Sequence, residues 1–126
     1  MDTITAVNDK ALTEFDPPLA VEQLVFEVAT GALDAWLAAD FEYWTKVEAD
    51  LFPFLRTKEV WVSRGAAVCR VTVVITWDGL EAWKSIDPAW IDAQERRFSD
   101  AVGADNYRLV SAEHEAEQYY KISEYR

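Results

Sequence analysis

Cysteine and histidine are almost absent from this sequence of 126 residues, and each scarcity excludes a class of site. Cys69 is the only cysteine, so the chain cannot form an internal disulfide, which suits a reducing compartment. His114 is the only histidine, and without further histidines or cysteines the sequence predicts no metal site. It also contains no glycine-rich phosphate loop, no nucleophile elbow and no Ser–His or Cys–His pattern. We therefore expect no cofactor.

Long apolar runs and an excess of positive charge are missing as well. No stretch of 18 apolar residues occurs, so the sequence predicts no membrane span. The first residues lack the basic and apolar regions of a secretory signal, and we expect a cytoplasmic protein. The net charge of -11 disfavours nucleic acid and anionic membrane surfaces as partners, since both would be repelled.

Apolar and aromatic residues are abundant and indicate a substantial core. Hydrophobic residues make up 51% of the chain, and six residues are tryptophan. The length fits one domain. We expect this domain to span residues 20–115, after a partly ordered N-terminal tail at 1–19 that ends in two prolines. Residues 116–126 would form a C-terminal tail that can add an extra edge strand.

The periodicity of the apolar residues predicts an α+β protein with the element order βαββαβ. Helical spacing follows Thr30 and should end before Pro53, and a capping pattern at Asp87-Pro88 starts another helix that ends at Gly103. A capping box at Asp78 predicts a short helix between them. Alternation predicts strands at 20–29, 58–63, 67–77 and 107–114.

The strand at 67–77 has two different faces. Cys69, Val71, Val73, Ile75 and Trp77 make one face entirely apolar, which suits packing against helices. The other face is mixed yet still rich in valine. We therefore expect a ferredoxin-like, four-stranded antiparallel sheet with helices on one face, whose free face pairs with that of a second copy in a homodimer. The alternative is a monomer with a patchy open face.

Several short stretches resemble a known superfamily. These are residues 40–45 (Asp-Phe-Glu-Tyr-Trp-Thr), residues 58–61 (Lys-Glu-Val-Trp), Trp77 at a strand end, and the pair Trp83-Lys84. Together they resemble an uncharacterised bacterial branch of the dimeric α/β-barrel superfamily, among proteins similar to antibiotic-biosynthesis monooxygenases. The resemblance covers roughly residues 20–115 and implies the ferredoxin-like fold and the dimer. The superfamily also includes haem proteins whose iron-binding histidine lies on a helix; His114, expected in a strand, departs from them.

Asp40 is the most informative polar residue, because it interrupts the apolar stripe of the first helix between Leu37 and Trp44. A carboxylate at such a position must find partners or shift its pKa. One interpretation makes Asp40 a general base or an anchor in a pocket between helix and sheet. The other places it at the edge of the stripe, or hydrogen-bonded to a tryptophan N–H.

The remaining candidates each have two interpretations. His114 is either a proton-transfer group or a surface residue beside two glutamates. Lys58 and Arg70 either hold an anionic ligand or pair with Glu27 across the dimer. Tryptophan side chains either wall a flat ligand pocket or fill the core, the candidates for the pocket being Trp44, Trp61, Trp77 and Trp83.

Two functions follow from these residues. The first is a cofactor-independent enzyme, monooxygenase- or isomerase-like, acting on a small hydrophobic or aromatic substrate between helices and sheet. It relies on the resemblance, on Asp40 and on the tryptophans. The second is a non-catalytic protein that binds a small ligand or serves in assembly through the dimer interface.

Overall fold

The computed structural model describes all 126 residues, and the chain forms an α+β structure with one curled antiparallel sheet. The strands are β1 (Thr3–Val7), β2 (Lys10–Ala29), β3 (Leu55–Ser63), β4 (Val68–Trp77), β5 (Tyr107–Ala112) and β6 (Tyr119–Tyr125). The helices are α1 (Leu33–Ala39), α2 (Lys46–Leu51), α3 (Leu80–Lys84), α4 (Pro88–Val102) and α5 (Glu113–Ala116). A π-helical turn, η2 (Asp40–Thr45), joins α1 to α2, and 3₁₀ turns occupy η1 (Thr30–Ala32) and η3 (Ala104–Asn106).

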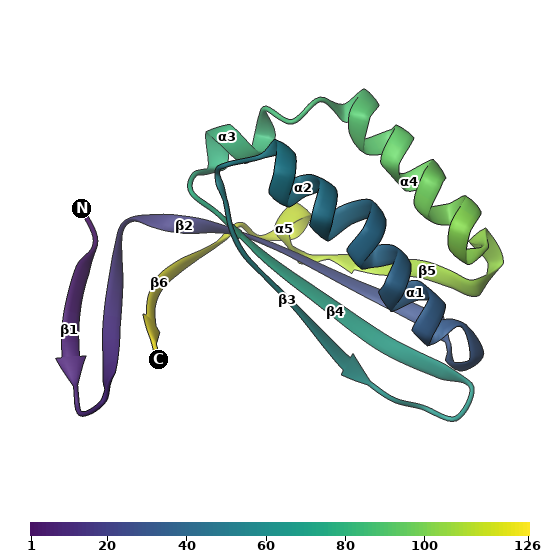
Figure 1. Ribbon diagram of the computed structural model, residues 1–126, viewed down its shortest axis with the longest axis horizontal. Coiled ribbons are helices and arrows are strands. Elements are labelled where there is room, and N and C mark those ends of the chain that lie inside the picture. The colour runs from purple at the N-terminus through teal and green to yellow at the C-terminus, as the bar shows by residue number, and fades with distance from the viewer.

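Four strands lie side by side in the order β5–β2–β4–β3, and every neighbouring pair is antiparallel. The helical stretch formed by α1, η2 and α2 and the helix α4 cover the same face of these strands (Figure 1). The alternation in β4 explains this arrangement, because its apolar side chains are at most 4% exposed beneath the helices. Trp36 of α1 and Phe98 of α4 meet above β2 and β4 and complete the core.

The opposite face of the four strands is left open by this chain. Arg70 of β4 lies there, together with Val68, which is 46% exposed, and Trp61 of β3, which is 54% exposed. No helix crosses this side of the sheet (Figure 1). We call this surface the open face.

The helices begin and end mostly where the sequence predicts. A continuous helical stretch runs from α1 through η2 to α2 and ends at Leu51, two residues before Pro53. Asp87 caps α4, since its carboxylate accepts a hydrogen bond from the backbone N–H of Ala89. The capping box at Asp78 is not formed, because its carboxylate binds Arg56 of β3 instead.

Residues 1–19 differ from the partly ordered tail predicted for them. They form β1 and the first half of β2, which bend away from the helices (Figure 1). Pro17 and Pro18 are tolerated because they lie between Glu14 and Leu19, where β2 skips its pairing. The C-terminal tail forms β6 beside β2. We call residues 1–15 and β6 with Arg126 the arm, and the rest of the molecule the body.

None of the helices is both long enough and apolar enough to cross a lipid bilayer.

Candidate functional site

A row of side chains across three strands places two charged residues beneath the helices. Ile75 of β4 pairs with Lys58 of β3 on one side and with Glu22 of β2 on the other. Directly opposed residues of antiparallel strands point to the same face of a sheet. Lys58 and Glu22 therefore share the helix-covered face with buried Ile75.

Lys58 binds both ends of the π-helical turn. Its Nζ lies 3.0 Å from each carboxylate oxygen of Asp40 and 2.6 Å from Oγ1 of Thr45. The Lys58 side chain is 7% exposed and that of Asp40 is 10% exposed, so this ion pair is buried. Burial raises the pKa of Asp40, whereas the charge of Lys58 and its hydrogen bond oppose that rise. The pair thus joins the centre of the helix to β3.

Glu48 brings a second buried carboxyl group from α2, two turns after Asp40. It is 7% exposed. Burial raises its pKa to about 7; Lys58 lowers it, while the charges of Glu22 and Asp40 raise it further. Lys58 thus acts on both Asp40 and Glu48.

Glu22 is the third acid of the group. Its Oε1 accepts a hydrogen bond of 3.2 Å from Nε1 of Trp77. Burial raises the pKa of Glu22 to about 7, against the lowering influence of that hydrogen bond and of Lys84 and Lys58. We call Glu22, Asp40, Glu48 and Lys58 the acid cluster.

A chain of aromatic rings runs beside the acid cluster. Trp77 is fully buried, and its ring is stacked with that of Trp83 at an angle of 4° and a centroid distance of 6.2 Å. The ring of Trp83 in turn meets His114 at 5.1 Å. In order, the contacting rings are Trp44, Trp90, Phe52, Trp77, Trp83 and His114.

Most of the residues proposed from the sequence lie along this cluster and ring chain. Asp40 and Lys58 are in direct contact, and Trp44, Trp77 and Trp83 belong to the rings. The hydrogen-bonded tryptophan N–H belongs to Trp77, and its acceptor is Glu22 rather than Asp40.

Three candidates lie elsewhere or in another setting than the sequence suggested. Trp61 and Arg70 lie on the open face, because they alternate with the residues that face the helices. His114 lies on α5 and not in a strand, because β5 ends at Ala112. Burial against Trp83 lowers the pKa of His114. Glu27 pairs with Arg108 of the same chain, at 2.6 Å.

Sequence reasoning missed Glu22 and Glu48, although a signal for each was present. Glu22 has the same parity as Leu24, Phe26 and Val28, the apolar face of its strand. Glu48 follows Asp40 and Trp44 at helical spacing. The criterion that singles out Asp40, a carboxylate on an apolar stripe, also identifies Glu22 and Glu48.

Two clefts on the molecule lie away from the acid cluster. One lies at the β2–β5 edge around Tyr107 and Asn106, and the other lies between arm and body. No group of three or more acidic, histidine or cysteine side chains is arranged to hold a metal ion. The acid cluster is thus a buried group of ionisable side chains that can take up and release protons.

Comparison of the chain with protein-family models, curated proteins and solved structures finds no match. What the protein does must therefore be inferred from the chemistry of the site itself.

Proposed function

We propose that this protein is a cofactor-independent acid–base enzyme, isomerase- or monooxygenase-like, for a small hydrophobic or aromatic substrate. The observation that carries the proposal is the burial of Glu48, which is 7% exposed and feels the charges of Lys58, Glu22 and Asp40; burial raises its pKa to about 7. A carboxyl group that titrates near the working pH is available both as a base and as an acid. Carboxyl groups on protein surfaces ordinarily keep their usual pKa values, whereas strongly raised values are concentrated at functional sites.

Each member of the acid cluster has a role in this proposal. Glu48 removes a proton from a carbon or hydroxyl group of the substrate. Lys58, held between Asp40 and Thr45, stabilises the negative charge that develops on a substrate oxygen. Asp40 acts as a positioning residue, because its carboxylate oxygens hold the Lys58 ammonium group in place.

The reaction balances in either form. In an isomerisation the proton returns to a different carbon from Glu48 or from Glu22, and nothing else is consumed. In an oxygenation O₂ is the oxidant: a CH₂ group becomes a carbonyl, one oxygen atom enters the substrate and the other leaves as water. Both begin with the same deprotonation, and the tryptophans supply flat apolar contact for the ring of the substrate.

Entry to the site would involve the π-helical turn. Turns of this kind occur often at functional sites, and this one carries Asp40 at its first position. Lys58 holds its two ends, so displacement of η2 would expose the acid cluster and Trp44 together.

The test is proton exchange at carbon in D₂O, followed by NMR with 2-tetralone and 1-indanone as probe carbon acids. The wild-type protein should accelerate exchange at the position next to the carbonyl, and Glu48→Gln should abolish the acceleration. Glu42→Gln is the matched control, since Glu42 is an exposed acid on the same helical stretch. Exchange that is equally fast with Glu48→Gln would contradict the assignment.

A second candidate function, assembly through the open face, is favoured by the uncovered Trp61 and Val68. We propose that the strand order β5–β2–β4–β3 represents a ferredoxin-like fold, and that two open faces pair to form a dimeric α/β barrel, as the resemblance to monooxygenase-like proteins implies. The protein would then be a homodimer in the cytoplasm, where Cys69 stays a free thiol. A non-catalytic binding or assembly protein would retain this dimer and show no exchange at carbon.

A further inference from the structure

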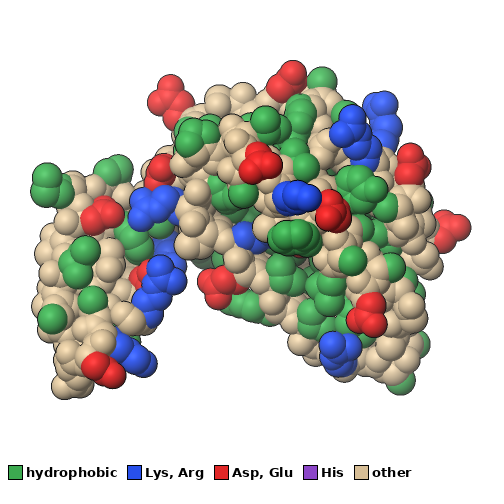
Figure 2. Space-filling view, in the orientation of Figure 1, with side chains coloured by type: hydrophobic (Ala, Val, Ile, Leu, Met, Phe, Trp, Pro, Cys, Tyr) green, Lys and Arg blue, Asp and Glu red, His purple; other side chains and the backbone are tan.

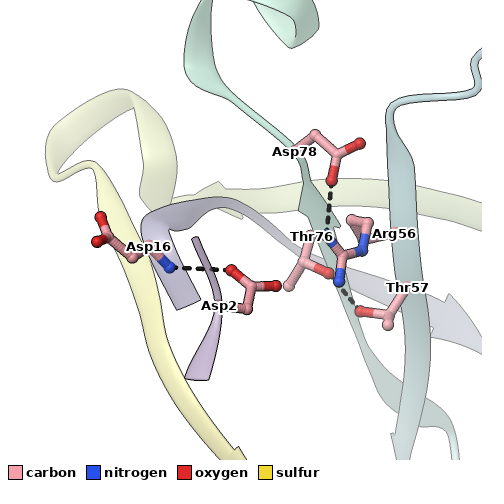
Figure 3. Close-up of polar contacts among 6 residues, drawn as sticks. All are labelled: Asp2, Asp16, Arg56, Thr57, Thr76 and Asp78. Atoms are coloured by element: carbon pink, nitrogen blue, oxygen red, sulfur yellow. Dashed lines mark hydrogen bonds and ion pairs between the residues drawn. The ribbon is translucent and has the colours of Figure 1, made fainter. Parts of the chain in front are cut away.

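The cleft between arm and body has the size of a small-molecule site. Its volume is about 360 Å³, and both parts of the molecule contribute to its walls. The arm supplies Ile4 and Phe15, and the body supplies Arg56 and Thr57. In Figure 3, Asp2 lies on the arm side, while Arg56 reaches Asp78 and Thr57 meets Thr76 on the body side.

Three cations line this cleft although the protein as a whole is strongly acidic. The lining side chains include three cations, Arg56, Lys121 and Arg126, against two carboxylates, Asp2 and Glu124. Figure 2 shows Lys and Arg side chains gathered along the gap between arm and body. Asp78, just outside the lining, pairs with Arg56 at 2.8 Å, so the charges at the cleft are nearly balanced, and its three cations are the groups that an anion would contact.

Glu124 shows how the cations bind a carboxylate. One of its oxygens lies 2.7 Å from Nζ of Lys121, and the other lies 3.1 Å from Nε of Arg126. The same two cations and Arg56 lower the pKa of Glu124, Lys121 most strongly. Arg56 uses Nη1 for Asp78 and still has further N–H groups to offer. Lys121 and Arg126 therefore already bind one carboxylate, that of Glu124, and Arg56 has N–H groups left for another.

The cleft also contains an apolar surface next to these charges. Phe15 is only 7% exposed, and Arg56 and Lys121 lie 5.7 and 5.8 Å from the centre of its ring. Ile4 and Leu19 line the same space. Cations beside an aromatic ring combine two kinds of contact that an organic anion with an apolar part can use at once.

We propose that this cleft binds a small organic carboxylate, with its apolar part against Phe15 and Ile4 and its carboxylate among Lys121, Arg126 and Arg56. The guanidinium groups match the planar geometry of a carboxylate. The site is separate from the acid cluster, so this inference does not depend on the catalytic proposal.

Calorimetric titration with benzoate tests the proposal, and benzamide serves as the neutral molecule of the same shape. Benzoate should bind saturably, and benzamide about tenfold more weakly or worse. Lys121→Gln should weaken benzoate binding by about tenfold, since it removes a charged donor. Glu124→Gln should strengthen benzoate binding several-fold, because an internal competitor is lost. Lys46→Gln, at an exposed lysine on α2, is the matched control and should leave the affinity unchanged.

Four results would overturn the proposal. They are equal binding of benzoate and benzamide, an equal loss of affinity with Lys46→Gln, no gain with Glu124→Gln, and inorganic phosphate binding as tightly as benzoate, which would indicate unspecific attraction of anions. Unfolding followed by tryptophan fluorescence verifies that each variant is folded. Unchanged benzoate binding by Glu48→Gln would show that the cleft and the acid cluster act separately, and loss of binding in this variant would count against the cleft as a separate site.

Discussion

Lys58 is the side chain on which the buried acids depend, because it is the cation in contact with Asp40. Lys58→Met would leave the Asp40 carboxylate buried without its partner. We expect the free energy of unfolding to fall by about 3–5 kcal/mol. Urea unfolding followed by tryptophan fluorescence measures this change.

The exposed pair between Lys46 and Glu42 provides the comparison for Lys58. Its side chains are 56% and 58% exposed, and water screens their charges. Lys46→Met should therefore cost less than about 1 kcal/mol. Similar losses for Lys46→Met and Lys58→Met would show that the burial of the Asp40 pair has no energetic consequence.

Glu48 links stability to pH. Its pKa is about 7 in the folded protein against the unperturbed value of 4.5, so the folded state binds more protons than the unfolded chain between these values. Stability should therefore fall as pH rises through this window. Glu48→Gln removes the effect, and at pH 8 it should be more stable than wild type by on the order of 3 kcal/mol.

The measurement is the free energy of unfolding of both proteins at pH 5 and pH 8. Glu22 keeps part of the pH dependence in the Glu48→Gln variant, because its own pKa is also raised to about 7. A variant whose stability changes with pH as steeply as that of wild type would mean that Glu48 is not protonated at neutral pH.

At the scale of elements, the arm and the body should unfold with different stabilities. The core cluster lies in the body, and all six tryptophans fall between Trp36 and Trp90. Deletion of residues 1–9 removes β1, whose residues are all exposed. We expect the unfolding midpoint reported by tryptophan fluorescence to remain nearly unchanged. A large decrease would show that β1 supports the body.

The body was largely predictable from the sequence, and the arm was not. Alternation in β4 indicates both its strand character and its buried face, because residues of equal parity share a face. Pro17 and Pro18 predict an extended tail, because the gap in pairing that admits them into β2 depends on β6 and is not visible in the local sequence. Similarly, a helical spacing does not distinguish a π turn from an α-helix, so η2 was not foreseen.

The candidate site was predictable where one residue contradicted its surroundings. Asp40 was identified because a carboxylate on an apolar stripe is costly. The sequence does not identify Lys58 as the partner of Asp40. Which residue of β3 faces the helices depends on how β3 pairs with β4, and that register is set by tertiary contacts. The register of β3 also decides the face on which Trp61 lies, so the sequence alone does not show that Trp61 and Trp77 lie on opposite faces of the sheet.

At the scale of the whole molecule, the proposed dimer depends on the open face. Trp61→Glu would place a charge where two sheets meet, and sedimentation at micromolar concentration should change from about twice the chain mass of 14.4 kDa to the monomer. Leu51→Glu is the control, since Leu51 is 53% exposed at the end of α2, away from the sheet. A monomeric wild-type protein, or dissociation by both variants, would contradict the dimer.

β2 serves two parts of the one sheet, because residues 20–29 pair with β4 while residues 10–14 pair with β1. Amide hydrogen exchange should therefore vary steeply along a single strand, with slow exchange in its second half and fast exchange in its first. The exchange rates along β2 would then report two separate events, the opening of the arm and the unfolding of the body. A deuteration time course resolved by peptide would distinguish them.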